Sequence, residues 1–111
     1  MIEKLSIGID IVDINRFKKL DYKKIFAKSE IDYCLKYRNF AEHFAGKFAV
    51  KEAVKKSVSK KIEMIDIITT HSKSKPKVRI RNESGYKFQV SISHEKNIAV
   101  GIVICELLAK L

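Results

Sequence analysis

Residues 39–59, NFAEHFAGKFAVKEAVKKSVS, constrain the fold more than any other stretch of the chain. Two kinds of side chain recur there every four residues, which is the spacing of neighbours on one face of a helix. The two rows are Phe40, Phe44 and Phe48, and Ala41, Ala45, Ala49 and Ala53. They predict a long helix in which an aromatic stripe lies beside a stripe of small residues, so that another backbone can approach closely. Gly46 costs such a helix about 1 kcal/mol relative to alanine, so we expect a packing reason for it.

The segments on both sides of this helix have the pattern of strands. In residues 4–14, KLSIGIDIVDI, every second residue from 7 to 11 is isoleucine, which predicts a strand with a buried isoleucine side and with Asp10 pointing the other way. Four more strands are predicted at residues 62–72, 77–82, 86–93 and 97–107, with turns at Lys75-Pro76, at 82–85 and at 94–97. The predicted fold class is α+β, with a mostly antiparallel sheet packed against a long helix in a single domain, residues 1–111.

Residues 15–37 join the first strand to the long helix. The stretch 15–26 is ambiguous, although Phe17, Leu20 and Phe26 are spaced as the apolar side of a short basic helix. In 28–37, Ser29 followed three residues later by Asp32 indicates the start of another helix.

The balance of charge points to an anionic partner. The chain has 23 Lys+Arg against 13 Asp+Glu, a formal net charge of +10. Such an excess suits nucleic acid, a membrane surface, an acidic protein or a phosphorylated ligand, and it is also compatible with a solvated face that has no specific partner. Cys34 and Cys105 match no zinc or redox spacing, and no signal peptide or membrane span is indicated, so a cytoplasmic protein is expected.

Asp10 and Glu52 form the candidate metal site. Mg²⁺ takes oxygen ligands and is typically held by one or two carboxylates, with waters and substrate phosphates completing its shell. One acid on a strand and one on a helix over the same sheet supply such a pair. The alternative is that Asp10 only ends a strand and that Glu52 makes ordinary helix ion pairs with Lys55 and Lys56.

The lysines of the long helix are candidate phosphate ligands. Lys47, Lys51 and Lys55 share one face at four-residue spacing, and Lys56 lies one turn after Glu52 on the neighbouring row. A phosphate bound by Lys56 would therefore lie near a metal at Glu52, although a solvated lysine face is equally compatible with the pattern. Ser93 and His94 end an outward polar row in the strand 86–93, while His43 and His71 are assigned no role.

Three blocks of the sequence resemble the signature blocks of holo-acyl-carrier-protein synthases, the small bacterial-type 4'-phosphopantetheinyl transferases. They are IGIDIVDINRF, FAGKFAVKEAVKK and VSISHEKNIAVGIVI, in the order and spacing of that family. The resemblance implies Mg²⁺-dependent transfer of 4'-phosphopantetheine from coenzyme A to a serine of apo acyl carrier protein, with release of 3',5'-ADP, as part of fatty acid biosynthesis. It also implies a homotrimer that binds coenzyme A in clefts between neighbouring subunits.

The same resemblance assigns roles to individual residues. Asp10 and Glu52 match the Mg²⁺ ligands, and Lys56 matches the lysine that contacts the coenzyme A phosphates and assists catalysis. Lys47 occupies a basic position before the glutamate block, and Ser93 and His94 match the pair that helps to bind the nucleotide. Arg16 matches an arginine that docks the acidic carrier protein. The neighbouring basic residues expected to share this docking are Lys18, Lys19, Lys23 and Lys24.

One departure and three rival functions remain open. Ser59 and Lys61 stand where family members usually have loop glycines, which puts the conformation of that loop in doubt. A nucleic-acid-binding module suits the charge, but Phe88 alternates in phase with Val90 and Ile92 and is expected in the core, not in base stacking. A metal-dependent nuclease lacks support because no glutamate is followed two residues later by lysine. A non-catalytic interaction domain is the third alternative.

Overall fold

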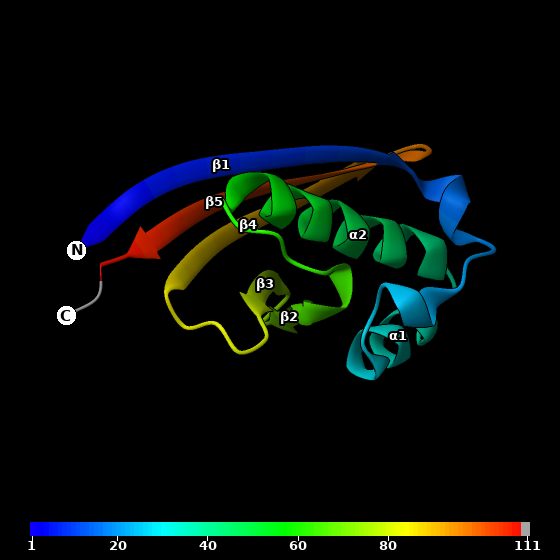
Figure 1. Cartoon of the computed structure of the whole chain (residues 1–111). Coiled ribbons are helices and arrows are strands. Elements are labelled where there is room, and N and C mark those ends of the chain that lie inside the picture. The colour runs from blue at the N-terminus through cyan, green and yellow to red at the C-terminus, as the bar shows by residue number, and fades with distance from the viewer. Residues whose placement is uncertain (110–111) are drawn as a thin grey trace.

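The computed structural model describes residues 1–109, in which two antiparallel sheets lie around one long helix (Figure 1). The larger sheet has the strand order β1-β5-β4, and the smaller one pairs β2 with β3. The strands are β1 (Ile2–Asp13), β2 (Ile67–Ser72), β3 (Lys75–Ile80), β4 (Tyr86–Glu95) and β5 (Ile98–Leu108). The helices are α1 (Lys28–Leu35) and the long α2 (Phe40–Ser57). The predicted α+β class, with a mostly antiparallel sheet packed against a long helix, is confirmed.

Helix α2 is enclosed from two sides. The three-stranded sheet covers one side, while the β2–β3 hairpin and α1 lie on the other (Figure 1). Two clusters of buried apolar residues fill these interfaces, one around Phe44 and one around Val54. Neither helix in residues 1–109 is long and apolar enough to cross a membrane.

The alanine stripe of α2 lies against glycines of the sheet. A Cβ added at Gly8 of β1 would lie 1.9 Å from the carbonyl oxygen of Ala53, and one at Gly101 of β5 would lie 2.7 Å from the carbonyl carbon of Ala49. The expected close backbone approach is therefore confirmed. Gly46 has the expected packing reason as well, because a Cβ there would lie 3.1 Å from Cγ2 of Ile92.

The prediction for the two sides of β1 was wrong in one respect. The isoleucine side is exposed, with relative exposures of 63% for Ile7, 56% for Ile9 and 64% for Ile11. The opposite side, which carries Gly8 and Asp10, faces α2, because only that side lets the helix backbone come close. Asp10 does point away from the isoleucines, and it therefore points towards the helix.

The strand boundaries differ from the predicted ones where turns intervene. The first predicted strand after α2 begins only at β2, because Met64–Asp66 form a 3-10 turn, η3. Lys75-Pro76 belongs to β3, and the turn lies before it at Lys73 and Ser74, both of which have positive φ. The β4–β5 connection is shorter than predicted, because His94 and Glu95 still pair with β5.

The basic segment after β1 consists of two 3-10 turns, η1 (Ile14–Phe17) and η2 (Tyr22–Lys24), in place of one short helix. Phe17 and Phe26 are buried as expected, whereas Leu20 is exposed. The capping prediction for α1 was wrong. Its cap residue is Ala27, whose N–H donates to the carboxylate of Glu30, while Asp32 pairs with Lys28 on the surface.

Candidate active site

Asp10, on β1, reaches the face of α2 that carries Glu52. Its Oδ1 forms an ion pair with Nζ of Lys56 at 3.1 Å, and the same ammonium donates to the carbonyl oxygen of Ile9 at 2.9 Å. Lys56 lies one helical turn after Glu52, so the two share a face of the helix. Asp10 and Glu52 are both half-buried. The structure thus brings a strand carboxylate to the helix row that contains the second candidate ligand.

The donor set at this place suits a hard divalent cation. Two carboxylates are what Mg²⁺ typically takes from a protein when substrate phosphates and waters supply the rest. Within residues 1–109 no group of three or more His, Cys, Asp or Glu side chains is placed to hold a metal, so a fully protein-ligated site is not formed there. Glu52 makes no ion pair with Lys55 or Lys56. Its carboxylate is therefore not used in the helix pairs that the alternative interpretation required.

Arg16 lies next to the same helix row. Its guanidinium lies 5.3 Å from the ring centroid of Phe48 and 5.7 Å from that of Phe17, distances typical of cation–π contacts. Phe48 is one turn before Glu52. The aromatic row of α2 thus fixes η1, and with it the exposed arginine, beside the candidate metal site.

The lysines of α2 do not form the shared solvated face that their spacing suggested. Lys47 and Lys51 are buried, with relative exposures of 2% and 0%, whereas Lys55, the third lysine of that face, is exposed. Nζ of Lys51 pairs with Oε1 of Glu30 at 2.7 Å, and both side chains are inaccessible to solvent. Lys51 is therefore a structural group and not a phosphate ligand.

Lys47 is buried without a carboxylate partner among the described residues. Its Nζ donates to Oγ1 of Thr69 at 3.0 Å and lies 4.7 Å from the ring centroid of Tyr33. Burial lowers the pKa of Lys47 below its usual range, and the charge of Lys51 acts in the same direction. A buried ammonium that lacks an anion is a favourable place for one to bind.

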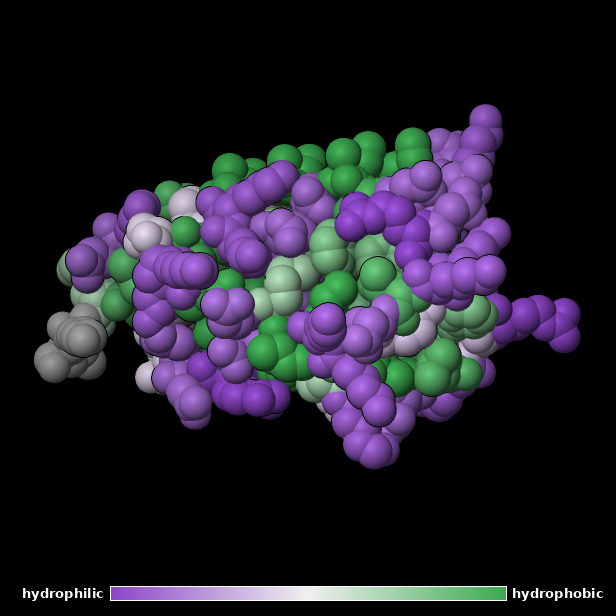
Figure 2. Space-filling view, turned by 45° about the vertical axis from the view of Figure 1, so that its right-hand side comes forward, coloured by the Kyte–Doolittle hydropathy of each residue, from purple (hydrophilic) through white to green (hydrophobic). Residues whose placement is uncertain are grey.

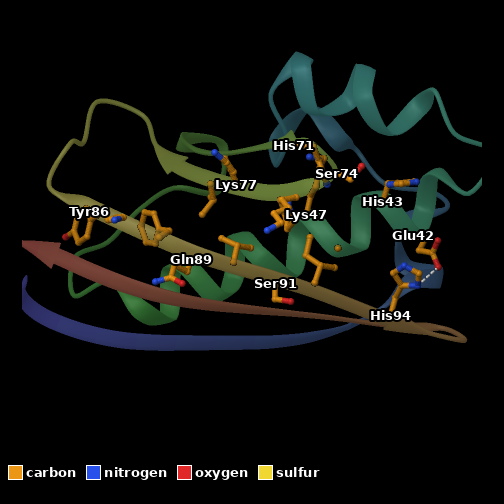
Figure 3. Close-up of a pocket in the computed structure, with 18 residues that line it drawn as sticks. Glu42, His43, Lys47, His71, Ser74, Lys77, Tyr86, Gln89, Ser91 and His94 are labelled. Carbon is orange, nitrogen blue, oxygen red and sulfur yellow. Dashed lines mark ion pairs between the residues drawn. The ribbon is translucent and has the colours of Figure 1, made fainter.

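Lys47 also lines a cavity of about 850 Å³ between α2, the β2–β3 hairpin and β4 (Figure 3). Strands β3 and β4 lie side by side here but belong to different sheets, which leaves the space open. All three histidines of the chain line it, from three different elements. The polar side chains of its wall include His43, Lys47, His71, Ser74, Lys77 and His94.

The two predicted nucleotide ligands on β4 point to different places. Nδ1 of His94 lies 2.7 Å from Oε1 of Glu42 at one end of the cavity (Figure 3). Ser93 does not line the cavity and is exposed on the outer side of the sheet, as the predicted outward polar row requires.

His43 and His71 were missed by sequence reasoning. Burial lowers the pKa of each, and the charge of Lys47 also lowers the pKa of His71. Nδ1 of His71 is buried without a hydrogen-bond partner in the described structure. The two histidines come from α2 and β2, and no local sequence signal indicates that these elements meet.

The candidate metal site and the cavity lie at opposite edges of the larger sheet. Asp10 is on the edge strand β1 and His94 is on the other edge strand, β4, with β5 between them. In register, Asp10 pairs with Gly101, which in turn pairs with Ile92. Helix α2 packs over Gly101 and Ile92, which lie between Asp10 and the cavity within one chain.

Comparison with known proteins decides the family. Residues 6–103 match the model of the 4'-phosphopantetheinyl transferase superfamily. The chain belongs to this superfamily. A holo-[acyl-carrier-protein] synthase of Ehrlichia chaffeensis is 39% identical over 90% of this chain and 94% of its own length, and one of Thermodesulfovibrio yellowstonii is 38% identical over 89% and 96%. The crystal structure of the Bacillus anthracis holo-(acyl-carrier-protein) synthase, in complex with CoA (3',5'-ADP), has a TM-score of 0.82 and 30% identity over 92% of this chain and 96% of that one.

The loop in which this chain departs from the usual family pattern needs no glycine in this structure. Positive φ among the non-glycine residues of 1–109 occurs at Lys73, Ser74, Asn82 and Lys96, and therefore not at Ser59 or Lys61. Lys60, between them, forms an ion pair with Glu83. The loop thus takes a path that ordinary residues adopt without strain.

Proposed function

We propose that this protein transfers 4'-phosphopantetheine from coenzyme A to a serine of an apo acyl carrier protein and releases 3',5'-ADP. The observation that carries the proposal is the meeting of Asp10 with the α2 row of Glu52 and Lys56. Membership of the superfamily and the named relatives support the same reaction. We further propose that it acts in the cytoplasm and serves fatty acid biosynthesis.

Asp10 and Glu52 are the residues that would hold Mg²⁺. When bound, the ion supplies positive charge that offsets the charge developing on the phosphates during transfer. Lys56 already lies against Asp10 and would bind a phosphate oxygen of coenzyme A from the same side. The attacking serine must lose its proton, and Glu52, which pairs with neither Lys55 nor Lys56, or a metal-bound water would accept it.

The cavity beside β4 is the proposed place of the nucleotide. Lys47 offers a buried positive charge that has no carboxylate partner within residues 1–109, and a phosphate of coenzyme A would supply the missing anion. His94 lies in the same wall, and a phosphate there would compete with Glu42 for the imidazole. Contact between Ser93 and the nucleotide stays a prediction, because Ser93 lies on the outer side of the sheet and does not line this cavity.

A homotrimer would join the two half-sites. The metal residues and the cavity lie at opposite edges of one sheet, so a cleft between two subunits would bring one half-site from each chain together. The outer side of β1 and β5 supports this, because it exposes a hydrophobic surface, here called the outer apolar face (Figure 2). Its residues include Leu5, Ile7, Ile9, Ile11 and Ile104. Contiguous apolar surface of this kind usually marks a protein interface.

The basic segment 16–24 is the proposed docking surface for the acidic carrier protein. Arg16, Lys19 and Lys23 are exposed there, and Lys18 and Lys24 add to the positive charge. Arg16 lies against Phe48, one turn from Glu52, so a carrier held by this segment would present its serine near the metal residues. Attraction between the opposite charges would speed the encounter and weaken with added salt.

Mass spectrometry of apo carrier protein incubated with coenzyme A, Mg²⁺ and enzyme tests the proposal. The wild type should add the mass of phosphopantetheine to the carrier, and Asp10→Asn or Glu52→Gln should reduce the rate by at least about a hundredfold. Lys55→Gln is the matched control, since Lys55 is an exposed neighbour on α2 and should keep the wild-type rate. Wild-type turnover in either carboxylate variant would exclude the metal assignment.

A further inference from the structure

Glu30 of α1 is the centre of a polar network buried in the interior. The residue has a relative exposure of 1%. Its Oε1 accepts hydrogen bonds from Lys51 Nζ at 2.7 Å and from the N–H of Ala27 at 2.8 Å. Its Oε2 accepts from the N–H of Thr69 at 3.0 Å and from the hydroxyl of the same threonine. Since both oxygens are used internally and neither faces solvent, Glu30 cannot contact a substrate.

One arm of the network reaches the basic segment. Besides Glu30, Lys51 Nζ donates to the carbonyl oxygens of Ile25 at 2.7 Å and Met64 at 3.2 Å, so all three of its hydrogens have acceptors. Ile25 directly follows η2 and is the first residue after the proposed docking surface, residues 16–24. Lys51 itself directly precedes Glu52 on α2. This arm therefore ties the docking surface to the helix that carries the candidate metal ligand.

The other arm reaches the cavity. The hydroxyl of Thr69 donates to Glu30 and accepts from Lys47, and this direction is fixed because an ammonium can only donate. Lys47 is the buried cation of the cavity wall. The position of its ammonium is therefore set through Thr69 by the carboxylate of Glu30.

We propose that Glu30 is a positioning residue that joins the two substrate sites, holding Lys47 for coenzyme A through Thr69 and holding the docking surface for the carrier through Lys51. The inference rests on the proposed function for the identity of the two substrates. A buried ion pair commonly gives no more stability than apolar groups of the same size. Placement of Lys47 and of the docking surface is a role that apolar groups could not take over.

Variants of the two arms separate this role from a general effect on folding. Thr69→Val removes the hydroxyl that links Glu30 to Lys47 and leaves Lys51 paired. The double variant Glu30→Leu/Lys51→Met removes the charged pair without leaving one buried charge alone. Glu30→Gln keeps the size of the side chain and weakens both arms. Thr70→Val is the matched control, because Thr70 is exposed on the same strand.

Steady-state kinetics with both substrates should distinguish the effect of the Thr69 arm from that of the Lys51 arm. We expect Thr69→Val to raise the KM for coenzyme A about fivefold to tenfold and to leave the KM for the carrier within about twofold. The double variant should raise the KM for both substrates by similar factors, and the control should change neither. A purely structural role would lower the amount of active enzyme and leave both KM values unchanged, which would overturn the inference.

Hydrogen exchange of the same variants, measured without substrates, tests the network independently of the reaction. Residues 16–25 should exchange faster in the double variant and in Glu30→Gln, and at the wild-type rate in Thr69→Val. If exchange in 16–25 is the same in all variants, Glu30 does not hold the docking surface. A wild-type enzyme that fails to modify the carrier, together with the expected exchange pattern, would refute the proposed function and leave the network as a structural link.

Discussion

Gly8 is a point of close approach between β1 and the backbone of α2. Replacement by alanine would put a methyl group on the backbone carbonyl of Ala53, and the overlap is relieved only if the backbone of β1 or α2 shifts. We expect Gly8→Ala to lower the free energy of unfolding by about 3 kcal/mol, the upper part of the range for overpacking. Urea denaturation measures it. Gly85→Ala is the control, since a Cβ there would lie 4.0 Å from Cδ1 of Leu107, and equal loss in both variants would contradict the steric account.

His71 is expected to make the stability of the protein depend on pH. Burial lowers its pKa below the ordinary value of 6.5, and the charges of Lys47 and His43 lower it further. The unfolded chain therefore binds the proton more readily, so stability is full above about pH 6.5 and falls as the pH drops towards the folded pKa. We expect Tm to decrease between pH 7 and pH 5.5, and to decrease less in His71→Phe, which keeps the stacking on Tyr33. Identical pH profiles for the two proteins would show that His71 does not titrate in this way.

The positions of some site residues could be predicted from the sequence, and those of others could not. Asp10 was predicted to lie opposite the isoleucines, and it does, because strand alternation is a local property. The burial of Lys47 and Lys51 could not be predicted, because helical spacing gives a shared face but not what covers it. Their partners, Glu30 and Thr69, come from α1 and β2, about twenty residues away on either side.

Among the elements, α2 was the most predictable and the basic segment the least. The four-residue rows of α2 specify both the helix and the close approach of the sheet, since each row is a local pattern. The segment 14–27 has no such period, and its two 3-10 turns depend on Phe17 and Phe26 entering the core. The exposed side of β1 was assigned wrongly because alternation identifies two faces without saying which one a helix will cover.

The docking surface yields a prediction for one substrate only. Arg16 is exposed, and its guanidinium lies 5.3 Å from the ring centroid of Phe48, which is one helical turn before Glu52. Arg16→Glu should raise the KM for the carrier about tenfold or more, because like charges then face each other, and should leave the KM for coenzyme A nearly unchanged. Initial rates at several salt concentrations measure this, and the difference between variant and wild type should shrink as salt rises. An equal increase in both KM values would argue against docking on this segment.

The whole molecule carries the two parts of the proposed site at opposite edges of the larger sheet, together with an exposed apolar surface. Asp10 and the cavity lie at opposite edges of the sheet, and the outer apolar face lies on the side of the sheet that α2 does not cover. A net charge of +10 favours an acidic partner but gives no reason for a row of exposed isoleucines. Assembly of like chains through that row would account for the exposed isoleucines, because it would bury them. It would also account for the separation of Asp10 from the cavity, because it would bring these two parts together from different subunits.

Ile9, at the middle of the outer apolar face, tests this assembly. Ile9→Glu should convert the proposed trimer into monomers, because an unpaired carboxylate cannot be buried between subunits at acceptable cost. The monomer should keep its fold, as Ile9 is 56% exposed in the single chain, and it should lose transfer activity because each chain then has only half of a site. Sedimentation measures the assembly and the carrier assay measures the activity, with Thr70→Glu as a charge control at an exposed position of the other sheet. A monomeric Ile9→Glu protein with wild-type turnover would show that one chain holds a complete site, and the inference from the two sheet edges would fail.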